Sequence, residues 1–97
     1  MIRIHPGAHA ESAEAHLHYL AENAETAERF LNAVIDGYAT AAASPLRWPQ
    51  DEDGFRRYKL PDFPYLIFYE VLPDGIHVFA VAHGARKPGY WHDRAGL

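Results

Sequence analysis

Two apolar segments in the second half of the chain dominate the hydrophobic pattern. Residues 66–72 are aliphatic or aromatic except for Glu70, and residues 76–82 are similar, with His77 as their only polar member. Residues 73–75, with the sequence Pro-Asp-Gly, lie between them and are of the types that form tight turns. Strands this apolar cannot leave one face in water along their whole length. We therefore expect a hairpin of two central strands.

The first half of the chain has helical periodicity after a short start. Residues 1–5 alternate apolar and polar side chains, which predicts a short strand that stops at Pro6 and Gly7. From about residue 8, apolar side chains recur every three or four positions and predict a first helix. The buried stripe expected for this helix comprises Ala13, Leu17, Leu20, Ala21 and Ala24.

A second helix is predicted directly after the first. Asn23 marks the interruption, and Thr26 is the expected N-cap of the second helix, which runs to about residue 42. Gly37 is a weak point in it, because glycine lowers the stability of a helix. Its expected buried stripe comprises Phe30, Leu31, Val34, Ile35 and Tyr38. Two helices with so short a link must fold back as an antiparallel hairpin.

A loop and a basic strand lead from the helices to the central hairpin. Residues 44–54 contain two prolines, three consecutive acids and no periodicity, and Trp48 is expected to fold back onto the domain. Residues 55–60 predict a strand with Arg57 and Lys59 on one face. The order is β-α-α-β-β-β. We expect a single α+β domain over residues 1–97, in which the helical hairpin packs on an antiparallel sheet.

Composition narrows the class of protein. The 97 residues are 48% hydrophobic and 23% charged, an ordinary balance for one globular domain with a single core. Cysteine is absent, the N-terminus lacks a basic segment followed by an apolar one, and no apolar run reaches the ~18 residues that a membrane helix needs. These features predict a cytoplasmic protein without a membrane contact.

Charge is distributed unevenly along the chain. The net charge of −4 disfavours a dedicated nucleic-acid binder. Residues 1–54 carry three basic and nine acidic residues, whereas residues 55–97 carry six basic and four acidic ones. The second half can therefore present a local positive surface to an anionic partner. Within it, Arg57 and Lys59 are two positions apart and lie side by side on one face of the predicted strand. They suit a phosphate backbone, but they equally suit a charged edge strand that resists aggregation.

The segment after the last strand combines aromatic residues with cations. Arg86 and Lys87 come first, then Tyr90 and Trp91, then Arg94. Such a mixture can stack bases and hold phosphates, or it can anchor the segment in a protein partner. Alternatively, Tyr90 and Trp91 close the core and pin the C-terminus, which we favour for Trp91, whereas we favour a functional role for Arg86.

Histidine is abundant, with seven residues, but the spacings do not indicate a metal site. His83 is the candidate for proton transfer, because it ends a central strand close to Arg86. The sequence has no glycine-rich phosphate loop and no nucleophile elbow. We therefore expect neither a metal nor an organic cofactor.

Three stretches resemble the RelE/ParE family of toxins from bacterial type II toxin–antitoxin modules. They are Ala-Glu-Arg-Phe-Leu at residues 27–31, Phe-Pro-Tyr-Leu-Ile-Phe-Tyr at residues 63–69, and Val-Ala-His-Gly-Ala-Arg-Lys-Pro at residues 81–88. The order of elements agrees, so the resemblance covers nearly the whole chain. It implies a cytoplasmic toxin of the plasmid-stabilisation type that inhibits growth.

The RelE branch of the family cleaves mRNA on the ribosome, and the resemblance implies a catalytic set for that case. The set comprises Arg57, Lys59, His83, Arg86 and Tyr90. Leu66, however, stands where the branch carries an arginine on the strand after the basic one. Loss of one such cation removes stabilisation of charge at the scissile phosphate, typically worth factors of roughly ten to a thousand in rate.

The ParE branch poisons DNA gyrase without that cationic set, and this chain is more similar to it through Tyr65, Tyr69, His83 and Arg86. The expected function is therefore binding of a protein target such as gyrase, with a cognate antitoxin as the usual partner. A ribosome-dependent endoribonuclease and a non-toxic relative are the alternatives, and a homodimer stays open. The residues expected to bind the target or the antitoxin are Arg86, Lys87, Tyr90, Trp91 and Arg94, together with Val34, Tyr38 and Trp48 on the helical side.

Overall fold

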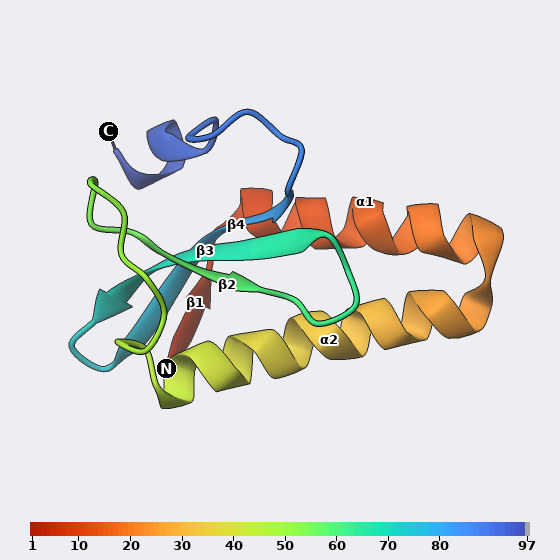
Figure 1. Ribbon diagram of the computed structural model, residues 1–97, viewed down its shortest axis with the longest axis horizontal. Helices are drawn as coiled ribbons and strands as arrows, with labels where there is room; N and C mark the ends of the chain where they lie inside the picture. The colour runs from red at the N-terminus through yellow and green to blue at the C-terminus, as the bar shows by residue number, and fades with distance from the viewer. Residues whose placement is uncertain (97) are drawn as a thin grey trace.

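The computed structural model, which describes residues 1–96, has the predicted order of elements (Figure 1). A four-stranded sheet carries a helical hairpin on one face, which confirms the α+β class. The elements are β1 (Ile2–Ile4), α1 (Pro6–Glu22), α2 (Ala24–Ala43), β2 (Arg56–Lys59), β3 (Tyr65–Leu72), β4 (Gly75–His83) and the short 3₁₀ helix η1 (His92–Ala95).

The sheet has the order β1-β4-β3-β2, so the apolar hairpin of β3 and β4 lies at its centre as predicted. The pairs β2–β3 and β3–β4 are antiparallel. The expectation of a wholly antiparallel sheet needs one correction, because β1 lies parallel to β4, with Ile2 opposite Ile76. Turn residues predict only pairs of strands that are neighbours in the sequence, whereas the partner of β1 lies more than seventy residues away.

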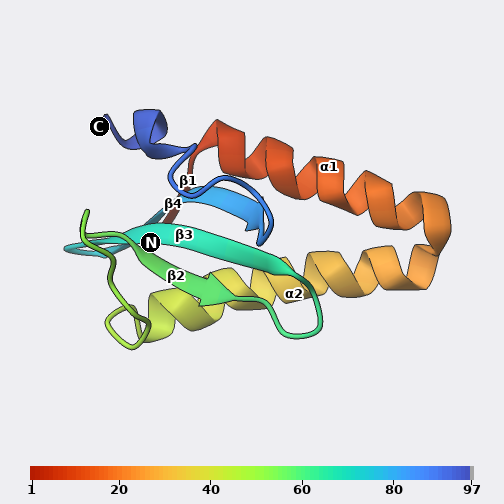
Figure 2. The ribbon, with the colours of Figure 1, turned by 45° about the horizontal axis from the view of Figure 1, so that its top comes forward.

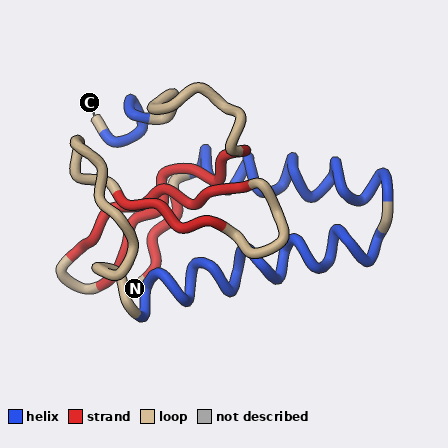
Figure 3. The backbone as a smooth tube through the Cα atoms, viewed as in Figure 1, coloured by secondary structure: helices blue, strands red, loops and turns tan. Residues whose placement is uncertain are grey.

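The buried face of α1 differs from the predicted stripe. Ala8, Ser12 and Ala15 are buried, whereas Leu17 is 62% exposed and Leu20 is exposed as well. Small side chains let α1 approach the sheet closely. Figures 1 and 3 show that the distal ends of the two helices extend beyond the strands. Tyr19, four residues after Ala15, still packs against Phe63 and Tyr65, so Leu17 and Leu20 are exposed because they lie on other faces of α1. The helix also starts earlier than expected, with Pro6 in its first turn.

The α2 helix follows its predicted stripe more closely, because Phe30, Val34 and Tyr38 are buried. Its N-cap is Asn23 rather than Thr26: the Thr26 N–H donates to Asn23 Oδ1 at 3.0 Å. Asn23 thus ends one helix and starts the next. Ile35, expected in the stripe, is 60% exposed.

Gly37 allows α2 to approach the sheet. A Cβ atom at this position would lie 2.8 Å from Ile67 Cδ1 and 3.0 Å from Tyr58 Cε1. We expect Gly37→Val to lower the free energy of unfolding by about 1–3 kcal/mol through overpacking, although valine is the better helix former. Urea unfolding of this variant, beside Ala39→Val at an exposed position of the same helix, measures the effect. A Gly37→Val protein as stable as the parent would show that the helix does not need this close approach.

Two hydrophobic clusters lie on opposite faces of the sheet. Ile67 and Tyr69 belong to the larger one, under the helices, and the alternation of β3 turns Phe68 to the other face. There the second cluster comprises Phe55, Phe79, Ala80 and Trp91, with Phe68 packed against it. Figure 2 shows the C-terminal segment (residues 84–96) crossing the sheet on the side away from α2. This segment forms the candidate site.

Candidate functional site

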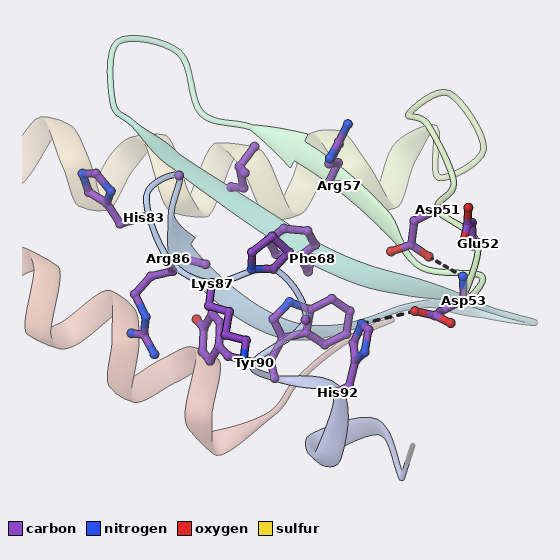
Figure 4. A pocket seen from close by; sticks show the side chains of 16 residues that line it. Asp51, Glu52, Asp53, Arg57, Phe68, His83, Arg86, Lys87, Tyr90 and His92 are labelled. Atoms are coloured by element: carbon purple, nitrogen blue, oxygen red, sulfur yellow. Dashed lines mark hydrogen bonds and ion pairs between the residues drawn. The ribbon is translucent and has the colours of Figure 1, made fainter.

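A groove of about 460 Å³ separates the C-terminal segment from β2, β3 and the turn at residues 51–53 (Figure 4). Its floor is apolar and includes Leu66, Phe68 and Ala82. The sequence places it there because β4 ends at His83 and the Gly-Ala-Arg-Lys-Pro-Gly stretch that follows turns the chain back over the open face of the sheet. Of the predicted site residues, the groove brings together Arg57, His83, Arg86, Lys87, Tyr90 and Trp91.

Trp91 lies beneath one wall of the groove and is itself buried. It is 1% exposed, and its ring packs edge-on against Phe55, with 4.9 Å between centroids, and in a tilted arrangement against Phe68, at 5.1 Å. The alternative in which Trp91 closes the core is therefore confirmed. The other expectation for Trp91, a contact with a target or an antitoxin, stays a prediction, because the side chain lies inside the protein here and no partner chain is present.

The cations of the groove have no acidic partners within residues 1–96. No carboxylate in this part of the chain lies within 4.0 Å of Arg57, Arg86 or Lys87. The Arg86 guanidinium instead stacks on the Tyr90 ring, with Cζ 4.0 Å from the centroid. His83 is exposed, and its Nδ1 accepts a hydrogen bond from the Ala85 N–H at 3.0 Å. Three positive groups thus remain available to a ligand.

Lys59 is not part of the groove. Its Nζ donates to the carbonyl oxygens of Leu60 at 3.1 Å and Phe63 at 3.3 Å, at the turn between β2 and β3. Arg57 and Lys59 do lie on the exposed face of β2, as predicted, but only Arg57 lines the groove. Because β2 is the last strand of the sheet, its two cations also fit the alternative of a charged edge strand.

Glu11 holds the C-terminal segment against α1, and sequence reasoning missed it. Its carboxylate accepts hydrogen bonds from the Val81 N–H at 3.1 Å, from both terminal nitrogens of Arg94 at 2.9 and 3.2 Å, and from the Tyr90 hydroxyl. We call this set the Glu11 clasp. Glu11 lies three residues after Ala8 and four before Ala15, so the small-residue face of α1 could have indicated it.

Tyr90 and Arg94 are held inside the protein by the clasp. Burial, together with the hydrogen bond to Glu11, raises the pKa of the Tyr90 hydroxyl well above its usual range. The hydroxyl therefore keeps its proton near neutral pH and directs it to Glu11. Arg94 Nη1 also donates to the Phe79 carbonyl at 3.0 Å. Tyr90 presents its ring, and not its hydroxyl, beside Arg86.

The binding role predicted for Val34, Tyr38 and Trp48 on the helical side stays a prediction. Val34 is 3% exposed and Tyr38 is also buried, so both side chains pack against the sheet in this structure. Burial raises the pKa of Tyr38 to about 12. Trp48 does fold back onto the domain, as predicted, with its ring edge-on to Tyr58 at 5.0 Å. The large apolar side chains that the two helices do expose are Leu17, Leu20 and Ile35.

Two further features, a metal-binding cluster and a membrane-spanning helix, are absent from residues 1–96. No group of three or more histidine, aspartate or glutamate side chains in this range is arranged to hold a metal ion. None of the helices described there has the length and apolar character required to cross a membrane.

Comparisons with known proteins agree with the fold. A family model described as "ParE toxin of type II toxin-antitoxin system, parDE" matches residues 2–88. The chain is similar to a solved structure described as "Chromosomal ParDE TA system from P. aeruginosa", with 16% identity and a TM-score of 0.73 over 84% of this chain and 92% of that one. At this identity the likeness shows the fold alone. No curated protein is significantly similar in sequence. Tyr90, Trp91 and Arg94 lie beyond the matched residues.

Proposed function

The chain belongs to the ParE toxin family of type II toxin–antitoxin systems, and we propose that it inhibits growth by binding a protein target, DNA gyrase, in the cytoplasm. A cognate antitoxin neutralises it. The observation that carries this proposal is the family match over residues 2–88, which includes every element from β1 to β4. The acidic net charge of −4 also suits a protein target better than a ribosome-bound message.

The arrangement of the groove supports binding rather than cleavage. The Tyr90 hydroxyl donates to Glu11, and Lys59 donates to backbone carbonyls, so two members of the expected catalytic set are engaged elsewhere. Leu66, on the floor, supplies no charge to a phosphate. These three features reduce the donors that phosphodiester cleavage would require.

A ribosome-dependent endoribonuclease is the second candidate, because one observation favours it. Arg57, His83 and Arg86 line the same groove, and together they offer two cations and a group that can transfer a proton near neutral pH. In that case Arg57 and Arg86 neutralise the phosphate and His83 takes the proton of the 2′-hydroxyl. The 2′-oxygen bonds to phosphorus, the bond to the 5′-oxygen breaks, and that oxygen takes a proton from water.

The antitoxin is proposed to cover the helical hairpin. Leu17, Leu20 and Ile35 are large apolar side chains that these two helices expose to water. Each Å² of apolar surface that the antitoxin buries there stabilises the complex by about 25 cal/mol, before the costs of association are subtracted. An adjacent small reading frame that encodes the antitoxin identifies the partner, and its co-expression should relieve growth arrest.

A pair of assays tests the proposed target. Purified protein should inhibit supercoiling by purified gyrase and should accumulate cleaved DNA complexes, and added antitoxin should abolish both effects. The same preparation should leave mRNA intact in a cell-free translation reaction. If the protein cuts mRNA and the Arg57→Gln variant does not, the proposal is overturned in favour of the endoribonuclease. Induced expression without growth arrest, and no effect in either assay, would identify a non-toxic relative.

A further inference from the structure

The groove carries opposite charges at its two ends. Figure 4 shows Asp51, Glu52 and Asp53 at one end and His83, Arg86 and Lys87 at the other, with Arg57 between them. Nevertheless, within residues 1–96 none of the three acids lies within 4.0 Å of an arginine or a lysine. These charges do not neutralise one another at contact distance, so their fields act on whatever enters the groove.

The three acids differ in the interactions that their carboxylates already make within the protein. Asp51 Oδ1 accepts hydrogen bonds from the Asp53 N–H at 2.9 Å and the Phe55 N–H at 3.0 Å, so it shapes the turn. The carboxylate of Asp53 lies 3.6 Å from His92 Nε2. Glu52 is exposed and is held by no ion pair within the described chain. Glu52 and Asp53 can therefore receive a cation from a ligand.

Nucleic acid does not suit this groove. A phosphate backbone that leaves the cationic end would run into three carboxylates. Base stacking needs an open aromatic face, but Trp91 packs against Phe68 and the Arg86 guanidinium covers the Tyr90 ring. A peptide meets neither obstacle, because its side chains can alternate in charge and its apolar groups can pack on Leu66 and Ala82.

We propose that the groove binds an extended segment of a protein partner, with an acidic side chain at Arg86 and Lys87, an apolar one over Leu66, and a basic one at Glu52 and Asp53. The site deepens the proposed function and rests on it only for the identity of the partner. The Glu11 clasp holds the wall of the groove in place without a ligand, which lowers the ordering cost of binding.

A peptide titration tests the site on the full-length protein. The probe is the acetylated and amidated peptide Glu-Glu-Leu-Val-Lys-Lys, added to isotope-labelled protein while amide resonances are followed by NMR. We expect shifts at the amides of Leu66, Ala82 and Gly89, which line the groove. The neutral peptide Gln-Gln-Leu-Val-Gln-Gln should bind about tenfold more weakly or not at all.

Matched variants locate the charges that matter. The double variant Arg86→Gln, Lys87→Gln should bind the charged peptide about tenfold more weakly than the parent protein. The double variant Arg3→Gln, Arg47→Gln removes the same charge outside the groove and should change the affinity less than about twofold. All four positions are exposed, and the dispersion of the amide spectrum verifies that each variant is folded. Equal weakening by both pairs would overturn the site.

Other results would also overturn the proposal. Shifts confined to residues outside the groove, or no shifts at peptide concentrations of a few millimolar, would do so. Groove shifts with a single-stranded oligoribonucleotide but none with the peptide would assign the groove to RNA instead. Because the titration needs no gyrase, peptide binding without gyrase inhibition would contradict the proposed target alone. Gyrase inhibition without peptide binding would contradict the site alone.

Discussion

Replacing Trp91 by alanine is expected to lower the free energy of unfolding by about 3–5 kcal/mol. The indole is 1% exposed and packs against Phe55, Phe68 and Phe79, so its removal leaves a cavity in the middle of the second cluster. A domain of this size has a total stability of roughly 5–15 kcal/mol, so the loss is a large fraction of it. Urea unfolding followed by circular dichroism measures the effect.

The other tryptophan supplies the matched control. Trp48 is half-buried in the loop before β2, and Trp48→Ala should cost less than about 2 kcal/mol because water can occupy the space that the ring leaves. Since the chain has two tryptophans, a Trp48→Phe background makes Trp91 the sole indole and its fluorescence a direct reporter. Equal losses for the two alanine variants would show that the C-terminal segment does not pack as described.

Replacing Glu11 by glutamine is expected to lower the free energy of unfolding by about 2–3 kcal/mol and to release the C-terminal segment. The carboxylate is 15% exposed and accepts from three residues at once, and glutamine has a single acceptor oxygen and an amide that faces the Arg94 guanidinium. Arg94 then lies partly buried without its anion. Hydrogen exchange should become faster for amides in residues 89–96 than elsewhere in the protein.

Two further variants distinguish loss of the Glu11 clasp from a general effect of removing a negative charge. Glu14→Gln changes an exposed carboxylate on the same helix and should cost less than about 0.5 kcal/mol. Glu11→Gln combined with Arg94→Gln removes both charges and should recover part of the stability lost by Glu11→Gln, because no unpaired charge is left in the interior. If Glu11→Gln and Glu14→Gln behave alike, the clasp contributes nothing to stability.

Most of the architecture was predictable because it depends on signals close together in the sequence. The β3–β4 hairpin follows from two apolar runs around a Pro-Asp-Gly turn, and the helical hairpin follows from periodicity interrupted at Asn23. The burial of Trp91 was one of two alternatives, and the structure selects it. Both hairpins are encoded by neighbouring segments of the chain, where propensity and periodicity are informative.

The candidate site was only partly predictable. The sequence indicates Arg57, His83, Arg86 and Lys87, which line one groove, but nothing in it connects them with the acidic end at residues 51–53. The apolar periodicity of α2 indicates Val34 and Tyr38 but does not say whether the protein itself already covers that stripe, so their burial comes from the structure and their binding role stays a prediction. Lys59 was grouped with Arg57 by alternation, although hydrogen bonds to the neighbouring turn hold it outside the groove.

The sequence by itself determined the order of elements, the family, and which side chains share a face of a strand or a helix. Tertiary structure alone decided what covers each face. The larger residues of α1, Leu17 and Leu20, marked the obvious stripe, yet close packing on the sheet selected the small ones and brought Glu11 to the C-terminal segment. Glu11 and Arg94 are 83 residues apart, and local periodicity carries no information about a contact at that separation. Packing of the whole chain supplies it.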